Sequence, residues 1–104
     1  MGAALALAGG EPPRPDDEAP LLASILLGKI SVDACAALGW SAESFHVDAH
    51  RAIFAAALDL HRAKRAVDVV SVGTWLKDHD RIAAVGGMRY LAELLAYDGP
   101  SALP

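Results

Sequence analysis

The first residues whose spacing could serve chemistry are two histidines, His46 and His50, four positions apart. On a helix such a pair shares one face, and helical zinc sites use this spacing in the string His-Glu-x-x-His, whose glutamate is the general base. Here the intervening residues are Val47, Asp48 and Ala49, and no third ligand stands at a recognisable spacing. We therefore expect no metal site. His46 is interpreted as lying near a helix start and His50 as partly buried.

A second candidate is the pair Gly86 and Gly87, because glycine-rich turns before helices can hold phosphates. The ATP-binding loop requires the string G-x-x-x-x-G-K-[ST], which the sequence does not contain, and it has no G-x-G-x-x-G either. The acids Asp16, Asp17 and Glu18 are explained as capping and first-turn carboxylates of a helix. We predict no catalytic and no cofactor-binding residues in this chain.

The one basic cluster follows His61, and Arg62, Lys64 and Arg65 form its possible polar contact patch. Such a patch could touch DNA phosphates or an acidic partner. The alternative interpretation is a solvated helix end, where cations stabilise the negative pole of the helix dipole. We favour this alternative because the rest of the chain is acidic.

The composition bounds the class of protein. The chain has 104 residues, of which 54% are hydrophobic, and a formal net charge of −4. This content excludes a disordered chain, and the acidic balance disfavours a domain whose main task is to grip phosphates. Cys35 is the only cysteine, so no internal disulfide is possible, and we interpret it as a buried thiol. No stretch approaches the ~20 apolar residues of a membrane span, and we expect a cytoplasmic protein.

The elements that must position these residues are helices. Glycines and prolines predict a flexible tail over residues 1–15, followed by one domain over 16–104. Apolar periodicity, caps and glycine stops predict an all-α, compact bundle of about five short-to-medium helices. We expect the first helix to end at Gly28, the second to span 32–38 and the third to span about 48–64. The fourth is expected to begin with Ser71 as its cap, and the fifth to follow Gly86 and Gly87 and to end before Asp98. The segment 67–70 is expected to be extended.

Three segments, read in order, carry a family likeness. The run 45–54 reads F-H-V-D-A-H-R-A-I-F, the run 67–72 reads V-D-V-V-S-V, and the run 85–94 reads V-G-G-M-R-Y-L-A-E-L. Together they resemble the N-terminal domain of a DnaB-type replicative DNA helicase. Pro20, Ser24 and His46 depart from the family pattern. The matching residues are Phe45, His50, Arg51, Ile53, Phe54, Asp68, Ser71, Gly86, Gly87, Tyr90, Leu91 and Leu94.

The resemblance implies a non-catalytic assembly and docking domain. Its expected partners are other copies within a hexameric helicase ring, a primase and a helicase loader, with DNA contacted only indirectly, at the replication fork. In the family a helical hairpin and a RecA-like ATPase domain follow this head, and residues 16–104 include neither. ATP and magnesium would belong to that motor domain. The motif residues read as packing and capping groups, with Phe45, Ile53, Phe54, Tyr90 and Leu91 as core anchors.

Two alternatives stay open at this point. The chain could be the helicase-interaction domain of a primase, which has a similar fold. It could also be a small stand-alone helical module that binds proteins or DNA, in which case Arg62, Lys64 and Arg65, with Arg51, would form one basic stripe.

Overall fold

The computed structural model describes the backbone of residues 15–101 and the side chains of residues 18–96. This part of the chain is all-helical, which confirms the predicted fold class. The predicted tail over 1–15 lies outside the described residues except for Pro15, which is the first residue of a helix. The helices are α2 (Pro15–Leu26), α3 (Val32–Ala37), α4 (Asp48–Arg62), α5 (Val69–Asp78), α6 (Ile82–Val85) and α7 (Gly87–Ser101), with a 3-10 turn η1 (Ala42–Ser44) before α4.

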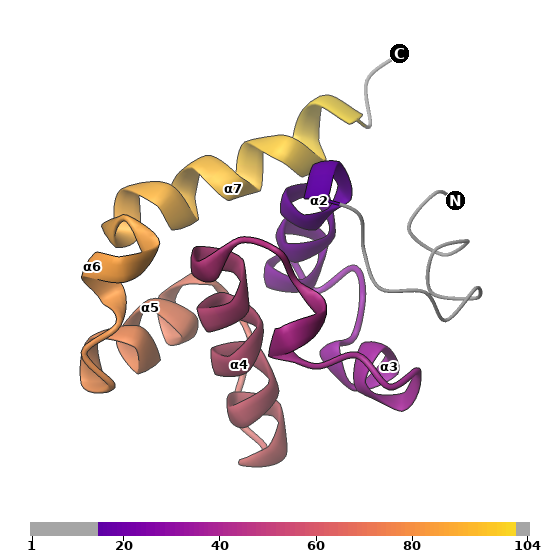
Figure 1. Ribbon diagram of the computed structural model, residues 1–104, viewed down its shortest axis with the longest axis horizontal. Helices are drawn as coiled ribbons and strands as arrows, with labels where there is room; N and C mark the ends of the chain where they lie inside the picture. Colours follow the sequence, from indigo (N-terminus) through magenta and orange to yellow (C-terminus); the bar gives the residue numbers. More distant parts are fainter. Residues whose placement is uncertain (1–14, 102–104) are drawn as a thin grey trace.

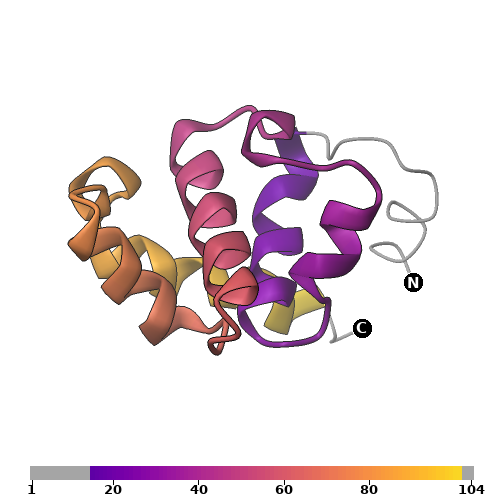
Figure 2. The same cartoon turned by 90° about the horizontal axis from the view of Figure 1, so that it is seen from below.

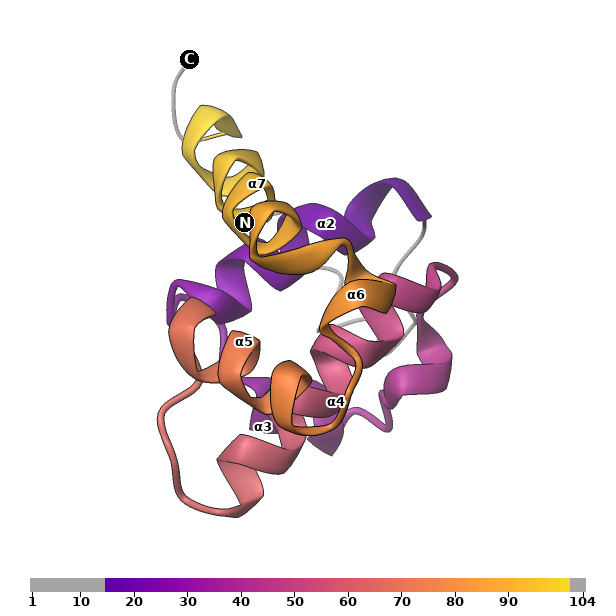
Figure 3. The ribbon, with the colours of Figure 1, turned by 90° about the vertical axis from the view of Figure 1, so that its left-hand side faces the viewer.

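Helix α4 lies at the centre of the molecule. Figures 1 and 2 show α5 and α6 on one side of it and α3 on the other, with α2 running beside it. Helix α7 crosses this layer and makes its most extensive contact with α2. Figure 3, seen from the side of α6, shows α6 leading directly into α7, which runs back toward α2. The two ends of the described sequence therefore pack against each other.

The sequence of α4 explains its central place. Its buried residues recur at helical spacing and form one broad apolar stripe, so the helix can be covered on several sides. Phe54 is fully buried, and its ring packs on that of Phe45 at a centroid distance of 4.9 Å. The wider core includes Leu22, Ile25, Val32, Cys35, Trp40, Ile53, Ala56, Ala57, Leu60, Val72, Leu76, Val85, Leu91 and Leu94.

Several predicted helix boundaries were wrong. The segment expected to be extended contributes Val69 and Val70 to the first turn of α5, and Asp68, rather than Ser71, is the N-cap. Helix α7 continues to Ser101 instead of ending before Asp98, and α4 ends at Arg62. The single-turn helix α6 was not predicted, because four residues are too few to show a helical period.

Other predicted signals are confirmed. Ser31 caps α3, since its hydroxyl accepts a hydrogen bond from the backbone N–H of Asp33, and Gly39 adopts the predicted left-handed backbone. The polar break after Asp78 separates α5 from α6. None of the helices in the described part of the chain is long and apolar enough to cross a bilayer.

Candidate functional site

The most concentrated polar contacts in the interior surround the carboxylate of Glu18, in the first half of α2. This side chain is fully buried and accepts four hydrogen bonds. Two come from His46, whose backbone N–H and ring Nδ1 lie 2.6 and 2.7 Å from Oε2. The others come from the backbone N–H of Val47, at 3.3 Å, and from Nδ1 of His50, at 2.8 Å from Oε1. A buried carboxylate is tolerated only when it is satisfied in this way.

This carboxylate lies beside the N-terminus of α4, although it belongs to another helix. Val47 is the N-cap residue of α4, and its own side chain cannot accept a hydrogen bond. Glu18 accepts from the backbone N–H groups of His46 and Val47, the two residues that directly precede α4. The negative charge also lies at the positive pole of the α4 dipole. Glu18 therefore joins α2 to the start of α4.

His50 extends the network to a third helix. Its Nδ1 faces Glu18, and its Nε2 lies 2.6 Å from the hydroxyl oxygen of Tyr90 in α7. The two rings stack at 5.9 Å with an angle of 20°. An ionised Glu18 requires the proton on Nδ1, so a neutral His50 accepts the hydroxyl hydrogen of Tyr90 on Nε2. This Glu18–His50–Tyr90 network links α2, α4 and α7 through the protein interior.

The environment keeps Glu18 ionised. Burial raises the pKa of its carboxyl group, but the hydrogen bonds from His50, His46 and Val47 together outweigh it, so the pKa lies below its usual value. At neutral pH the group is a carboxylate that has its donors in place. Its order of acid, imidazole and hydroxyl resembles a catalytic triad, but its contacts are used to hold helices together.

Sequence reasoning missed Glu18, which it interpreted as a first-turn carboxylate. The signal that could have found it is its register, because Leu21, Leu22 and Ile25 follow at i+3, i+4 and i+7 and are all buried. Glu18 thus stands on the apolar face of α2. An acid in that register needs an interior partner, and the two histidines were the available donors.

The other motif residues support the same architecture. Arg51 is exposed, and its Nε donates to the carbonyl oxygen of Phe45 at 2.7 Å, which ties the connector to α4. The carboxylate of Asp68 accepts from the backbone N–H of Ser71 at 2.8 Å and caps α5. The structure buries Phe45, His50, Ile53, Phe54, Leu91 and Leu94, whereas Tyr90, expected as a core anchor, is half-buried.

The paired glycines position Tyr90. Gly86 adopts a left-handed backbone with φ of 97°, and a Cβ atom there would lie 3.2 Å from Cβ of Tyr90. This turn therefore needs glycine both for its conformation and for its close approach to the ring. Gly87 is the first residue of α7 and also has a left-handed backbone, but a Cβ atom there would have no other atom within 4 Å. The motif acts on the Glu18–His50–Tyr90 network through the placement of one tyrosine.

The predicted polar contact patch lies at the far end of α4. Arg62, Lys64 and Arg65 are all exposed, and Lys64 has a left-handed backbone with φ of 60°. The backbone N–H of Lys64 donates to His61 at 2.9 Å, and that of Arg65 donates to Leu60 at 2.9 Å, which closes the helix end. We call residues 62–65 the basic turn. Arg51, placed in the same stripe by one hypothesis, lies instead in the first turn of α4.

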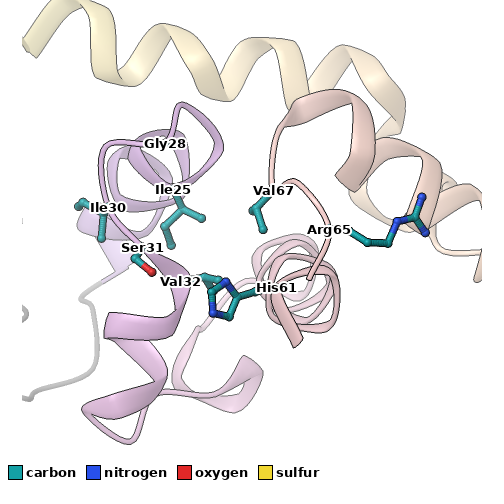
Figure 4. Close-up of a pocket in the computed structure, with 8 residues that line it drawn as sticks. All are labelled: Ile25, Gly28, Ile30, Ser31, Val32, His61, Arg65 and Val67. Atoms are coloured by element: carbon teal, nitrogen blue, oxygen red, sulfur yellow. The ribbon is translucent and has the colours of Figure 1, made fainter. Parts of the chain in front are cut away.

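A cavity adjoins the basic turn (Figure 4). It lies between the α2–α3 connection, the end of α4 and the segment that leads to α5, and it has a volume of about 270 Å³. Its lining residues are Ile25, Gly28, Ile30, Ser31, Val32, His61, Arg65 and Val67. In the described side chains no group of three or more histidine, cysteine or acidic residues is arranged to hold a metal ion.

Cys35 lies in the hydrophobic core, apart from the Glu18–His50–Tyr90 network. Its thiol is buried, and burial raises its pKa to about 11, only partly opposed by a hydrogen bond from its own backbone. A thiol with so high a pKa is a poor nucleophile at neutral pH. Its place is in the core between α3 and its neighbours.

Comparison with known families decides the relationship of this chain. The family model described as the DnaB-like helicase N terminal domain matches residues 11–102. The chain belongs to the DnaB-like helicase N-terminal domain family. The DnaB-like domain thus accounts for nearly all of this sequence, and it includes both the Glu18–His50–Tyr90 network and the basic turn.

Individual relatives agree with this assignment. The chain is 45% identical over 53 residues to the replicative DNA helicase DnaB of Synechocystis sp., and 42% identical over 53 residues to that of Nostoc sp.. Each of these matches covers 51% of this chain but only 6% of the relative. A probable replicative DNA helicase of Trieres chinensis is 26% identical over 75 residues, which is 72% of this chain and 16% of that protein. No solved structure matches the DnaB-like domain described here.

Proposed function

We propose that this chain is a non-catalytic assembly and docking domain of a replicative DNA helicase, acting at the replication fork in the cytoplasm. The observation that carries the proposal is the family match over residues 11–102. The similar proteins are themselves described as replicative DNA helicases, which favours a helicase over a primase as the parent protein.

The internal chemistry supports a scaffolding role over a catalytic one. The carboxylate of Glu18 binds the rings of His46 and His50 and the backbone N–H of His46 just before α4. This cluster therefore stabilises the arrangement of the helices. The sequence has no ATP-binding string. ATP hydrolysis would therefore belong to a motor domain of the parent helicase.

The surface supports contact with other proteins. Val70 has 67% of its surface exposed, and Leu27, Leu38, Val47 and Met88 are also exposed, so apolar side chains are available on the surface for contact with another protein. The net charge of −4 favours protein contacts over direct binding of DNA. In this proposal the domain associates with further copies in the helicase ring and docks a primase or a helicase loader.

The direct test is a titration of the chain with the C-terminal domain of its cognate primase, and separately with the cognate loader, followed by calorimetry. Binding of either protein supports the docking role, and absence of binding by both removes it. Light scattering over a concentration series tests self-association. A strictly monomeric chain that also fails to enter rings of the intact helicase would contradict the assembly role.

A further inference from the structure

The cavity beside the basic turn is not used by any contact described so far. Ile25, Val32 and Val67 give it apolar walls, and His61 lies at its edge. Figure 4 shows Ile25 and Val67 facing one another across the space. The elements around it come from three separate parts of the chain, so the cavity exists only in the folded domain.

Its size points to one side chain as the occupant. Sites for small molecules and cofactors usually measure roughly 300–1,000 Å³ and bury most of the ligand. This cavity measures about 270 Å³. A space at the lower limit of that range has room for a single large apolar side chain, such as leucine or phenylalanine, projecting from a peptide.

The charge beside the cavity is positive and unneutralised. Arg62, Lys64 and Arg65 lie within four consecutive positions, of which the remaining one is Ala63. All three cations are exposed. Within the part of the chain that the structure describes, none of the three side chains has an ion-pair partner. Arg65 forms part of the lining, and Figure 4 shows its guanidinium extending outward from the cavity. An occupant that leaves the cavity on this side meets cations.

The α2–α3 side of the cavity has a different character. His61 Nε2 lies 3.6 Å from a carboxylate oxygen of Asp33, in the first turn of α3. Lys29 is exposed between the lining residues Gly28 and Ile30, so this side carries charges of both signs. The basic turn carries cations alone, and an acidic segment is therefore attracted most strongly to that side.

DNA fits this surface less well than an acidic peptide. A phosphate backbone could pair with the basic turn, but it has nothing apolar to fill the space between Ile25 and Val67. A peptide supplies both parts, because it can combine one apolar anchor with a few carboxylates.

We propose that this surface docks an acidic peptide segment of a partner protein, with one large apolar side chain in the cavity and neighbouring carboxylates over Arg62, Lys64 and Arg65. The proposal rests on the docking role proposed above, to which it assigns a surface and a partner chemistry. It requires no rearrangement of the Glu18–His50–Tyr90 network, which lies at the opposite end of α4.

The experiment is a nuclear magnetic resonance titration of the isotope-labelled chain. The probe is a short synthetic peptide with one leucine flanked by glutamates, and two control peptides replace the leucine by glycine or the glutamates by lysines. We expect saturable shifts of Ile30, His61, Arg65 and Val67 with the probe alone, weakened by added salt. Equal shifts with all three peptides, or none with the probe, would overturn the proposal.

Variants separate the two halves of the surface. Arg65→Glu combined with Lys64→Glu should weaken probe binding roughly 5-fold or more, since it replaces attraction by repulsion. Val67→Phe, which fills the cavity, should weaken binding to a similar extent while the charges remain. Arg81→Glu combined with Lys77→Glu makes the same charge change at two exposed cations outside the cavity lining and should leave binding unchanged. Thermal melts check that each variant is folded.

The remaining outcomes also decide the matter. If a DNA duplex displaces the probe, and binding of that duplex is abolished by the charge reversal but not by Val67→Phe, the surface is a phosphate site. If Val67→Phe abolishes self-association of the chain, its occupant is a second copy. Either result overturns the proposal. If the cognate primase or loader binds the chain but none of these variants weakens that binding, the docking role stands and this surface is not the one used.

Discussion

Oε1 of Glu18 lies 2.8 Å from Nδ1 of His50, across 32 positions of sequence, and both side chains are buried. The contact brings the first described helix to the central one, and Tyr90 adds the last helix at 2.6 Å from the other ring nitrogen. Three helices are thus held together by polar groups as well as by the apolar core. The predictions below test this arrangement and the packing around it.

Replacing Glu18 by glutamine should destabilise the domain by about 2–4 kcal/mol. Glutamine keeps the shape, but it loses the charge and points an amide group at donors from His46 and His50. Urea unfolding measures the loss. Glu93→Gln is the matched control, because Glu93 is exposed and pairs with Arg89 only at 3.8 Å. Equal stability of the two variants would mean that the buried contacts contribute nothing.

The stability should fall at acidic pH because of Glu18. Its pKa is lowered in the folded state, so the contribution is fully present above the unfolded value of about 4.3 and is lost as the pH falls through the lower folded value. Urea melts at a series of pH values below about 5 measure this acid limb. Glu18→Gln should flatten it. An unchanged acid limb in that variant would assign the pH dependence to other carboxylates.

Gly86→Ala should destabilise the domain more than Gly28→Ala. Both glycines have a left-handed backbone, which costs alanine about 1 kcal/mol. At Gly28 a new Cβ atom would have no other atom within 4 Å, whereas at Gly86 the new Cβ atom would lie 3.2 Å from Cβ of Tyr90. Thermal melts of the two variants, with a chemical shift measurement on His50, separate backbone cost from displacement of the tyrosine. Equal losses of stability in the two variants would show that Tyr90 moves away from the new Cβ atom at no cost.

Phe54→Ala should destabilise the domain by about 3–5 kcal/mol, because the ring is fully buried and leaves a cavity against Phe45. Guanidinium unfolding gives the value. Leu58→Ala provides the comparison on the same helix, since Leu58 is only partly buried and should cost less. A near-neutral Phe54 variant would contradict the described orientation of α4.

Lys64→Gly should stabilise the domain by about 0.5–1 kcal/mol. Lys64 ends α4 in the left-handed conformation that glycine adopts without strain, and its exposed side chain makes no described contact. Lys64→Ala retains the strained backbone and should show no gain in the same thermal melts. A loss of stability on introducing glycine would mean that the lysine side chain holds the helix end.

The sequence allowed the fold class to be predicted, because periodic apolar residues, Ser31 and Gly39 act locally. It allowed the family to be predicted because the three motif segments 45–54, 67–72 and 85–94 occur in order. It did not allow the cap of α5 to be chosen. Asp68 and Ser71 are three residues apart, and either can cap a helix. Only the folded structure shows that the carboxylate of Asp68 accepts a hydrogen bond from the backbone N–H of Ser71. The assignment to Ser71 made Val69 and Val70 look extended, so one local ambiguity displaced a whole helix start.

The interior network was beyond local reasoning for another reason. The histidines were recognised as a pair, but their partner lies 28 and 32 positions away, and an acid near a helix start already had a sufficient explanation as a capping residue. The cations of the basic turn are exposed at the end of α4, and their role as a contact patch stays a prediction. The cavity beside it could not be predicted, because its walls come from the α2–α3 connection, the end of α4 and the segment before α5.

Val47 begins α4 without a capping side chain of its own, and this has a consequence for the order of folding. An excised peptide spanning α4 lacks the carboxylate that holds His46 and Val47 in front of its first turn, so this end should fray while the central turns form. In the intact chain the N–H groups of these two residues gain their acceptor only when α2 arrives, after closure of a long loop. The entry to α4 should therefore become ordered later than its central turns, even though α4 is the central helix.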